Sequence, residues 1–168
     1  MPMSARIPKA KIVTLGCPKN EVDSEEIAGV LQASGYNVDG SAEQTDITII
    51  NTCGFIRASK DESLAAIRDA IKEKKAGKTG KVVVAGCLSQ RMGEELNQLV
   101  QGIDVVVGVG QMARFGEIAH TALGGSGTRL TIARPEHHYA GIGTRARTGL
   151  PWSAYLKIGE GCDHECAF

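Results

Sequence analysis

The sequence predicts an α/β fold, in which a five-stranded, doubly wound, mostly parallel sheet carries helices on both faces. Two observations predict it. Short apolar runs of β type alternate with longer segments of helical periodicity, and three of the runs end at a cysteine. Strands joined through helices run parallel, so their carboxyl ends meet at one edge of the sheet. A chain of 168 residues suits one such domain with part of a second.

The first half of the chain contains three expected strands and two expected helices. The strands are residues 11–16, 36–38 and 46–51. After the first strand, the capping candidates Asn20, Asp23 and Ser24 precede apolar positions at helical spacing, and Gly35 ends that helix. A second helix is expected over residues 57–76, where a lysine-rich last turn suits the negative end of the helix dipole.

The second half continues the alternation and then changes character. Strands are expected at residues 81–86 and 105–109, and helices around residues 94–100 and 115–122. After Gly124 the sequence is rich in Gly, Pro, Ser, Thr and Arg and has little periodicity. We therefore expect a first domain over residues 1–124, a linker or arm over 125–150, and the start of another domain over 151–168, opening with a strand at 155–158.

Composition and charge exclude several classes of partner. Lys plus Arg and Asp plus Glu number 19 each and aromatic residues make up 4%, so no direct nucleic-acid binding is expected of this segment. There is no signal-like apolar region at the N-terminus and no apolar run of roughly 18 residues, so no membrane partner is expected either. The sequence predicts a cytoplasmic protein. In that compartment five cysteines, an odd number, indicate ligands or catalytic thiols rather than disulfides.

Three cysteines share one local context. Cys17, Cys53 and Cys87 end the runs KIVTLGC, DITIINTC and KVVVAGC, with spacings of 36 and 34 residues. In the strand order 2-1-3-4-5 the first, third and fourth strands are neighbours, so the three thiols would line one edge of the sheet. Such a thiolate cage predicts an iron–sulfur cluster. Zinc is the main competitor, although it prefers four closed ligands, and simple packing of buried cysteines is the structural alternative.

Two other functional classes stay open at this stage. Residues 108–113 have a GxGxxA form between a strand and a helix, which is compatible with a nucleotide-binding domain but also with an ordinary glycine-rich turn. A non-enzymatic interaction domain with packed cysteines is the third class. His137 and His138 lie in the expected arm and are interpreted as a solvated pair rather than as metal ligands.

Four motifs carry a family resemblance. They are LGCPKNEVDSE (15–25), NTCGFI (51–56), GCL (86–88) and YLKIGEGCDHECAF (155–168). Together they resemble the radical S-adenosylmethionine methylthiotransferases. The wording is closest to the members that methylthiolate the β-carbon of an aspartate in small-subunit ribosomal protein twelve. The tRNA-modifying members, which remain the alternative, typically have GCQMN and NTCSIR at the first two motifs.

The resemblance implies two clusters and a substrate. Cys17, Cys53 and Cys87 would hold an auxiliary 4Fe-4S cluster, to which the sulfur donor binds. Cys162 and Cys166 would be the first two ligands of a CxxxCxxC cluster that acts with S-adenosylmethionine, and the third cysteine would fall at position 169. The partner would be the ribosomal protein, and the chain would be an N-terminal part that includes the first strand of a truncated radical-SAM barrel. Such a part is expected to be inactive alone, and the sequence assigns no catalytic residue.

Overall fold

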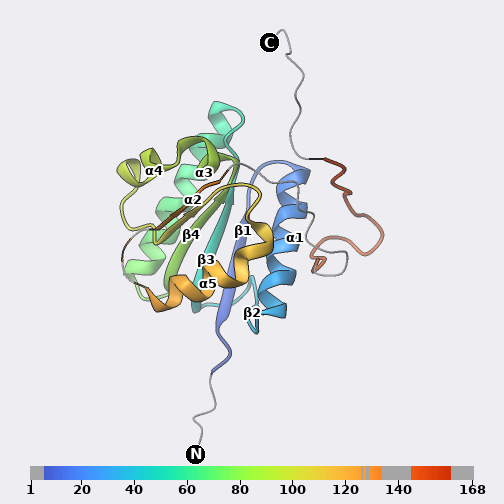
Figure 1. The fold of residues 1–168 in the computed structure, drawn as a ribbon, viewed down its shortest axis with the longest axis horizontal. Helices are drawn as coiled ribbons and strands as arrows, with labels where there is room; N and C mark the ends of the chain where they lie inside the picture. Colours follow the sequence, from blue (N-terminus) through green and yellow to red (C-terminus); the bar gives the residue numbers. More distant parts are fainter. Residues whose placement is uncertain (1–5, 126, 128, 134–144, 160–168) are drawn as a thin grey trace, which may run out of the picture.

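The computed structural model describes residues 6–125, 127, 129–133 and 145–159, and its centre is a parallel sheet between two layers of helices (Figure 1). The strand order is β2-β1-β3-β4-β5-β6, and every neighbouring pair is parallel. The strands are β1 (Lys9–Thr14), β2 (Asn37–Val38), β3 (Thr45–Thr52), β4 (Thr79–Gly86), β5 (Val105–Val107) and β6 (Arg129–Thr131). The helices are α1 (Pro18–Ala33), α2 (Arg57–Lys75), α3 (Cys87–Met92), α4 (Glu94–Leu99) and α5 (Phe115–Gly124), with a 3-10 turn η1 (Met112–Arg114).

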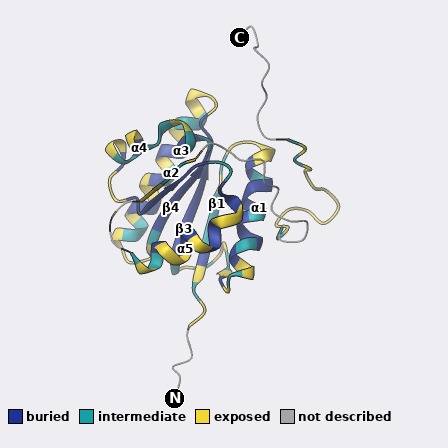
Figure 2. Cartoon of the chain, viewed as in Figure 1, coloured by how far each residue is buried: buried dark blue, intermediate teal, exposed yellow. Residues whose placement is uncertain are grey.

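The sheet separates two apolar cores (Figure 2). Helices α1 and α5 cover one face, where Leu31 and Phe115 are fully buried. Helices α2, α3 and α4 cover the other face, where Ile67 and Leu96 are fully buried. The central strands β3 and β4 are buried on both sides, which is why they read as continuous apolar runs rather than as alternating patterns. No helix among the described residues is long and apolar enough to cross a membrane.

The predicted α/β class with a parallel sheet is confirmed, but the predicted number of five strands is wrong. A sixth strand, β6, lies inside the expected arm (125–150) and pairs with β5, Val105 opposite Arg129 and Val107 opposite Thr131. It has only three residues, of which two are exposed, so it lacks the apolar signal that marks the other strands.

The expected strand at residues 155–158 is also wrong. The described residues there form no strand and pair with no strand of the sheet. The run is β-like in composition, but a strand exists only where a neighbour accepts its backbone hydrogen bonds. Accordingly, the part of the chain that the structure describes contains no strand of a second domain.

Helix α1 begins earlier than its capping candidates suggest, and α3 was not expected from the sequence. Helix α1 starts at Pro18 with Cys17 as its N-cap, because proline is well suited to the first position of a helix, whose N–H would have no partner. Helix α3 starts directly at Cys87, and the Ser89 hydroxyl donates to the carbonyl oxygens of Gly86 (2.8 Å) and Val107 (2.5 Å). Both cysteines therefore stand at the junction of a strand and a helix.

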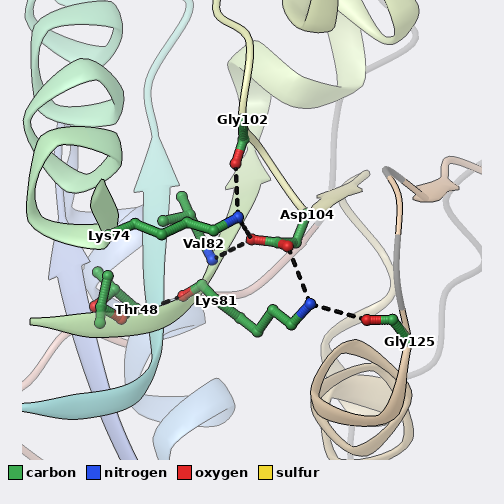
Figure 3. A network of polar contacts seen from close by, with 8 residues as sticks. Thr48, Lys74, Lys81, Val82, Gly102, Asp104 and Gly125 are labelled. Atoms are coloured by element: carbon green, nitrogen blue, oxygen red, sulfur yellow. Dashed lines mark hydrogen bonds and ion pairs between the residues drawn. The ribbon is translucent and has the colours of Figure 1, made fainter. Parts of the chain in front are cut away.

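A buried carboxylate fixes the end of the sheet that lies away from the cysteines (Figure 3). One Asp104 oxygen accepts from Lys74 Nζ (2.5 Å) and from the backbone N–H of Val82 (2.9 Å), and the other lies 3.3 Å from Lys81 Nζ. Lys81 also donates to the carbonyl oxygen of Gly125 (2.8 Å). Asp104 thus joins α2 and β4 to the start of β5, and Lys81 extends the network to the residue after α5.

Replacing Asp104 should test this network. We expect Asp104→Asn to lower the free energy of unfolding by about 2–4 kcal/mol, because two lysines lose their buried counter-charge. Asp69→Asn is the matched control, since the exposed pair of Asp69 with Lys72 should contribute less than about 0.5 kcal/mol. Urea unfolding measures both. Equal losses in the two variants would contradict the assignment.

Candidate functional site

Three cysteines lie at the carboxyl ends of three adjacent strands. Cys17 follows β1 by three residues, while Cys53 and Cys87 directly follow β3 and β4. The β1–β3 pairing continues toward Cys17, because the N–H of Leu15 donates to the carbonyl oxygen of Asn51 (3.0 Å). Cys17 is exposed, Cys53 is buried and Cys87 is half-buried, and all three carry free thiols. The structure therefore brings together the cysteines that the sequence singled out, along what we call the thiol edge (Cys17, Cys53 and Cys87).

Glycine permits the close approach of the first two cysteine loops. Gly16 has φ +94°, and a Cβ placed on it would lie 2.4 Å from Cys53 Cβ and 2.9 Å from Cys53 Sγ. Gly86 also has φ +94°, and its Cβ would lie 2.5 Å from Thr52 O. A side chain at Gly16 would therefore displace Cys53, and one at Gly86 would push β4 from the end of β3.

The loop after Cys53 lies against the start of α3. A Cβ on Gly54 would come within 3.0 Å of Leu88 Cα, and Arg91 donates to the carbonyl oxygen of Gly54 (2.6 Å). Beside this contact is a mostly apolar pocket of about 280 Å³. Its lining residues are Gly54, Phe55, Cys87, Gln90, Arg91 and Val109. Small apolar groups could thus reach the Cys87 thiol.

The thiols influence each other electrostatically. Burial raises the pKa of the Cys87 thiol, and the neighbouring Cys53, Cys17 and Asp23 raise it further, while Lys157 opposes the rise. Even so, the described residues contain no group of three or more His, Cys, Asp or Glu that could hold a single metal ion. The mutual electrostatic effect places the three thiols in one neighbourhood at this edge.

Two asparagines hold the cysteine loops together. The amide nitrogen of Asn20 donates to the carbonyl oxygens of Leu15 (2.7 Å) and Thr52 (3.0 Å), which precede Cys17 and Cys53. The amide nitrogen of Asn51 donates to the carbonyl oxygen of Asn20 (2.8 Å) and to Ser24 Oγ (3.0 Å). The sequence placed Asn20 and Ser24 as helix caps. The structure uses them instead to lock α1 onto the ends of β1 and β3.

A distant stretch, the anchor segment (residues 145–159), lies along α1 (Figure 1). Its main contact is Glu25, which is 2% exposed. The Glu25 carboxylate accepts from the backbone N–H of Thr148 (2.9 Å) and Gly149 (3.4 Å) and from Arg145 Nε (2.5 Å). Burial alone would raise the pKa of Glu25, but these donors outweigh it and hold the pKa below its usual value.

A second contact joins the anchor segment to the start of α1. Lys157 Nζ lies 2.5 Å from Asp23 Oδ1, and the two side chains are only 10% and 8% exposed. Lys19 Nζ is 3.5 Å from the carbonyl oxygen of Gly159. Sequence reasoning missed these contacts, because their partners are more than 120 residues apart. The signal that could have found them is the set of carboxylates on α1 matched by cations in the anchor segment.

Of the remaining candidates from the sequence, the structure describes some, and others lie outside the described residues. Gly108, in the GxGxxA pattern, lies against the Gln90 side chain, and a Cβ there would lie 2.2 Å from Gln90 Oε1. Cys162, Cys166 and the pair at 137–138 lie outside the described residues.

Comparisons with known proteins match this region. The model of the family described as Uncharacterized protein family UPF0004 matches residues 9–108. The chain is 41% identical over 155 residues to "Ribosomal protein uS12 methylthiotransferase RimO" of Anaeromyxobacter sp. (strain Fw109-5), covering 92% of this chain and 32% of the relative. Proteins of the same name match at 40% in Symbiobacterium thermophilum (99% and 34%) and at 41% in Bdellovibrio bacteriovorus (98% and 36%). The chain spans about a third of the length of these relatives. The resemblance inferred from the motifs is confirmed.

Alanine at Gly16 should disturb Cys53 specifically. Both Gly16→Ala and its control Gly35→Ala (φ +86°) place a Cβ at positive φ, which costs about 1–2 kcal/mol. No atom lies within 4 Å of the added Cβ at Gly35, whereas Cys53 occupies that space at Gly16. We expect Gly16→Ala to lose about 1–3 kcal/mol more in urea unfolding. We also expect Cys53 to react faster with a thiol reagent in this variant alone; identical behaviour of the two variants would contradict the contact.

Docking of the anchor segment should weaken in acid. A carboxyl whose folded pKa lies below its unfolded value of about 4.3 stabilises the docked state above that pH, and the contribution is lost as pH falls through the folded pKa. Hydrogen exchange at the amides of Thr148 and Ala146 should therefore lose protection in acid, after correction for the intrinsic rate. Glu25→Gln should lose it already at pH 7, whereas the control Glu117→Gln, in an exposed pair, should not. Unchanged protection in Glu25→Gln would refute the anchor.

Proposed function

The chain belongs to the UPF0004 family, and on this basis we propose that it is the N-terminal part of a methylthiotransferase. The whole protein would add a methylthio group to the β-carbon of an aspartate in small-subunit ribosomal protein uS12. The names of its relatives support this substrate over a tRNA. Ribosomes being its target, the protein would work in the cytoplasm, and its partner would be the ribosomal protein.

The observation that carries the proposal is the thiol edge. Thiolates are the ligands of iron–sulfur clusters, and Cys17, Cys53 and Cys87 come from three adjacent strand ends. In a four-iron cluster each thiolate binds a different iron, so the sulfurs stand farther apart than the ligands of one ion. Three converging thiolates, rather than the four closed ligands that structural zinc prefers, support a cluster over zinc. Three ligands would leave one iron free of protein.

The second ligand pair would be Cys162 and Cys166, which lie outside the described residues. When bound, the two 4Fe-4S clusters and S-adenosylmethionine would supply the electron, the radical and the sulfur that the transfer requires.

The described residues have supporting tasks in this proposal. Cys87 must lose its proton to bind iron, and its raised pKa means that binding releases that proton. The mostly apolar pocket beside Cys87 would offer room for apolar groups next to this ligand. Phe55 and Ile56, which are 79% and 56% exposed, border the same edge and would contact the rest of the protein.

Substituting serine for Cys53 should show whether this cysteine is a metal ligand or only a packed side chain. Serine is similar in size but a poor ligand for iron, so Cys53→Ser should abolish anaerobic reconstitution and cost the fold only roughly 1–2 kcal/mol. Iron, sulfide and visible absorbance measure this. In the present chain we expect iron equivalent to one cluster, and the control Cys162→Ser should retain it. Full iron and sulfide in Cys53→Ser would overturn the ligand assignment.

A further inference from the structure

The pair of Asp23 and Lys157 is unusual in its burial and its position. Each side chain is about nine-tenths buried, and their charged atoms are 2.5 Å apart. Burying a carboxylate is costly unless a counter-charge and hydrogen bonds compensate it. The counter-charge on Asp23 comes from the anchor segment, 134 residues further along the chain. The compensation is therefore present only while the anchor segment is docked.

Asp23 also stands close to the thiol edge. It lies one helical turn after Asn20, whose amide binds the carbonyl oxygen next to Cys53. Cys17 is the N-cap of α1, so Asp23 and its partner Lys157 lie at the second turn of the helix that begins at the thiol edge. With Lys157 removed, an uncompensated carboxylate would face thiols that must become anionic to bind iron. Like charges in a partly buried place oppose one another strongly.

We propose that Lys157 is a positioning residue of the thiol edge, whose pairing with Asp23 couples docking of the anchor segment to metal binding by the three cysteines. The inference rests on the proposed function, in which these cysteines bind a cluster. Coupling between two binding events is reciprocal. A docked anchor segment favours the cluster, and a bound cluster, with its added negative charge, favours a docked Lys157.

The first test is retention of iron by the reconstituted chain against a chelator. We expect Lys157→Met to lose iron about tenfold faster than the unchanged chain, a coupling of ordinary size. Lys157→Arg keeps the charge and should retain iron. The double variant Asp23→Asn with Lys157→Met has no charge to compensate and should return to within about threefold of the unchanged chain. Lys72→Met, at an exposed pair on α2, is the matched control.

The second test measures whether cluster binding strengthens docking of the anchor segment. Hydrogen exchange at the amides of Ala146 and Thr148, which are bonded to Glu25, reports docking of the anchor segment. Reconstitution should slow this exchange in the unchanged chain. The effect should be absent in Lys157→Met and in Cys53→Ser. These amides touch no cysteine, so a merely local effect of the cluster would not move them.

The outcomes separate this inference from the proposed function. Iron loss from Lys157→Met at the unchanged rate would overturn the coupling while leaving the cluster in place. Failure of the double variant to recover, despite urea unfolding like that of the unchanged chain, would also overturn it, because charge compensation would not be the cause. If the unchanged chain takes up no iron or sulfide, the proposed function is wrong, and the coupling, which depends on it, is wrong as well.

Discussion

The parallel order of β1, β3 and β4 is the constraint on which the site depends. Parallel strands must be joined by crossovers, so each returns to the same end of the sheet before it stops. Residues that are 34 or more positions apart in the sequence then become neighbours without any further contact being needed. The asparagine bonds and the close glycine contacts at Gly16 and Gly86 refine this arrangement by a few ångströms. If one strand were reversed, its cysteine would lie at the opposite edge of the sheet, and these contacts could not form.

Helix α1 packs against two parts of the protein, the sheet and the anchor segment. Its apolar side chains, such as Ile27 and Leu31, face the sheet, while Asp23 and Glu25 are buried beneath the anchor segment. A helix covered on two sides has no simple apolar stripe, because carboxylates occupy positions that are inside the protein. The polar residues of the first motif thus make structural contacts, because the helix packs against the sheet on one side and the anchor segment on the other.

What the sequence could predict follows from how local each signal is. The central strands are apolar runs bounded by turns, so the sheet, its parallel direction and the meeting of the three cysteines could be inferred from them. Strand β6 could not be, since it has three residues and no apolar pattern. The partner of Asp23 has no local signal either, because only the long-range match between carboxylates on α1 and cations in the anchor segment indicates it. Local periodicity does not indicate contacts between residues that are far apart in the sequence.

The two buried aspartates show why such returns matter for function. Asp104 is compensated by Lys74 and Lys81, which belong to α2 and β4, so its counter-charges are in place whenever the sheet is folded. Asp23 takes its counter-charge from a segment outside the sheet, and our proposal is that this segment docks and undocks while the sheet stays intact. The first arrangement can only stabilise the fold. The second makes the charge beside the thiol edge depend on the position of the following chain, which is the physical requirement for communication between this domain and whatever that chain leads to.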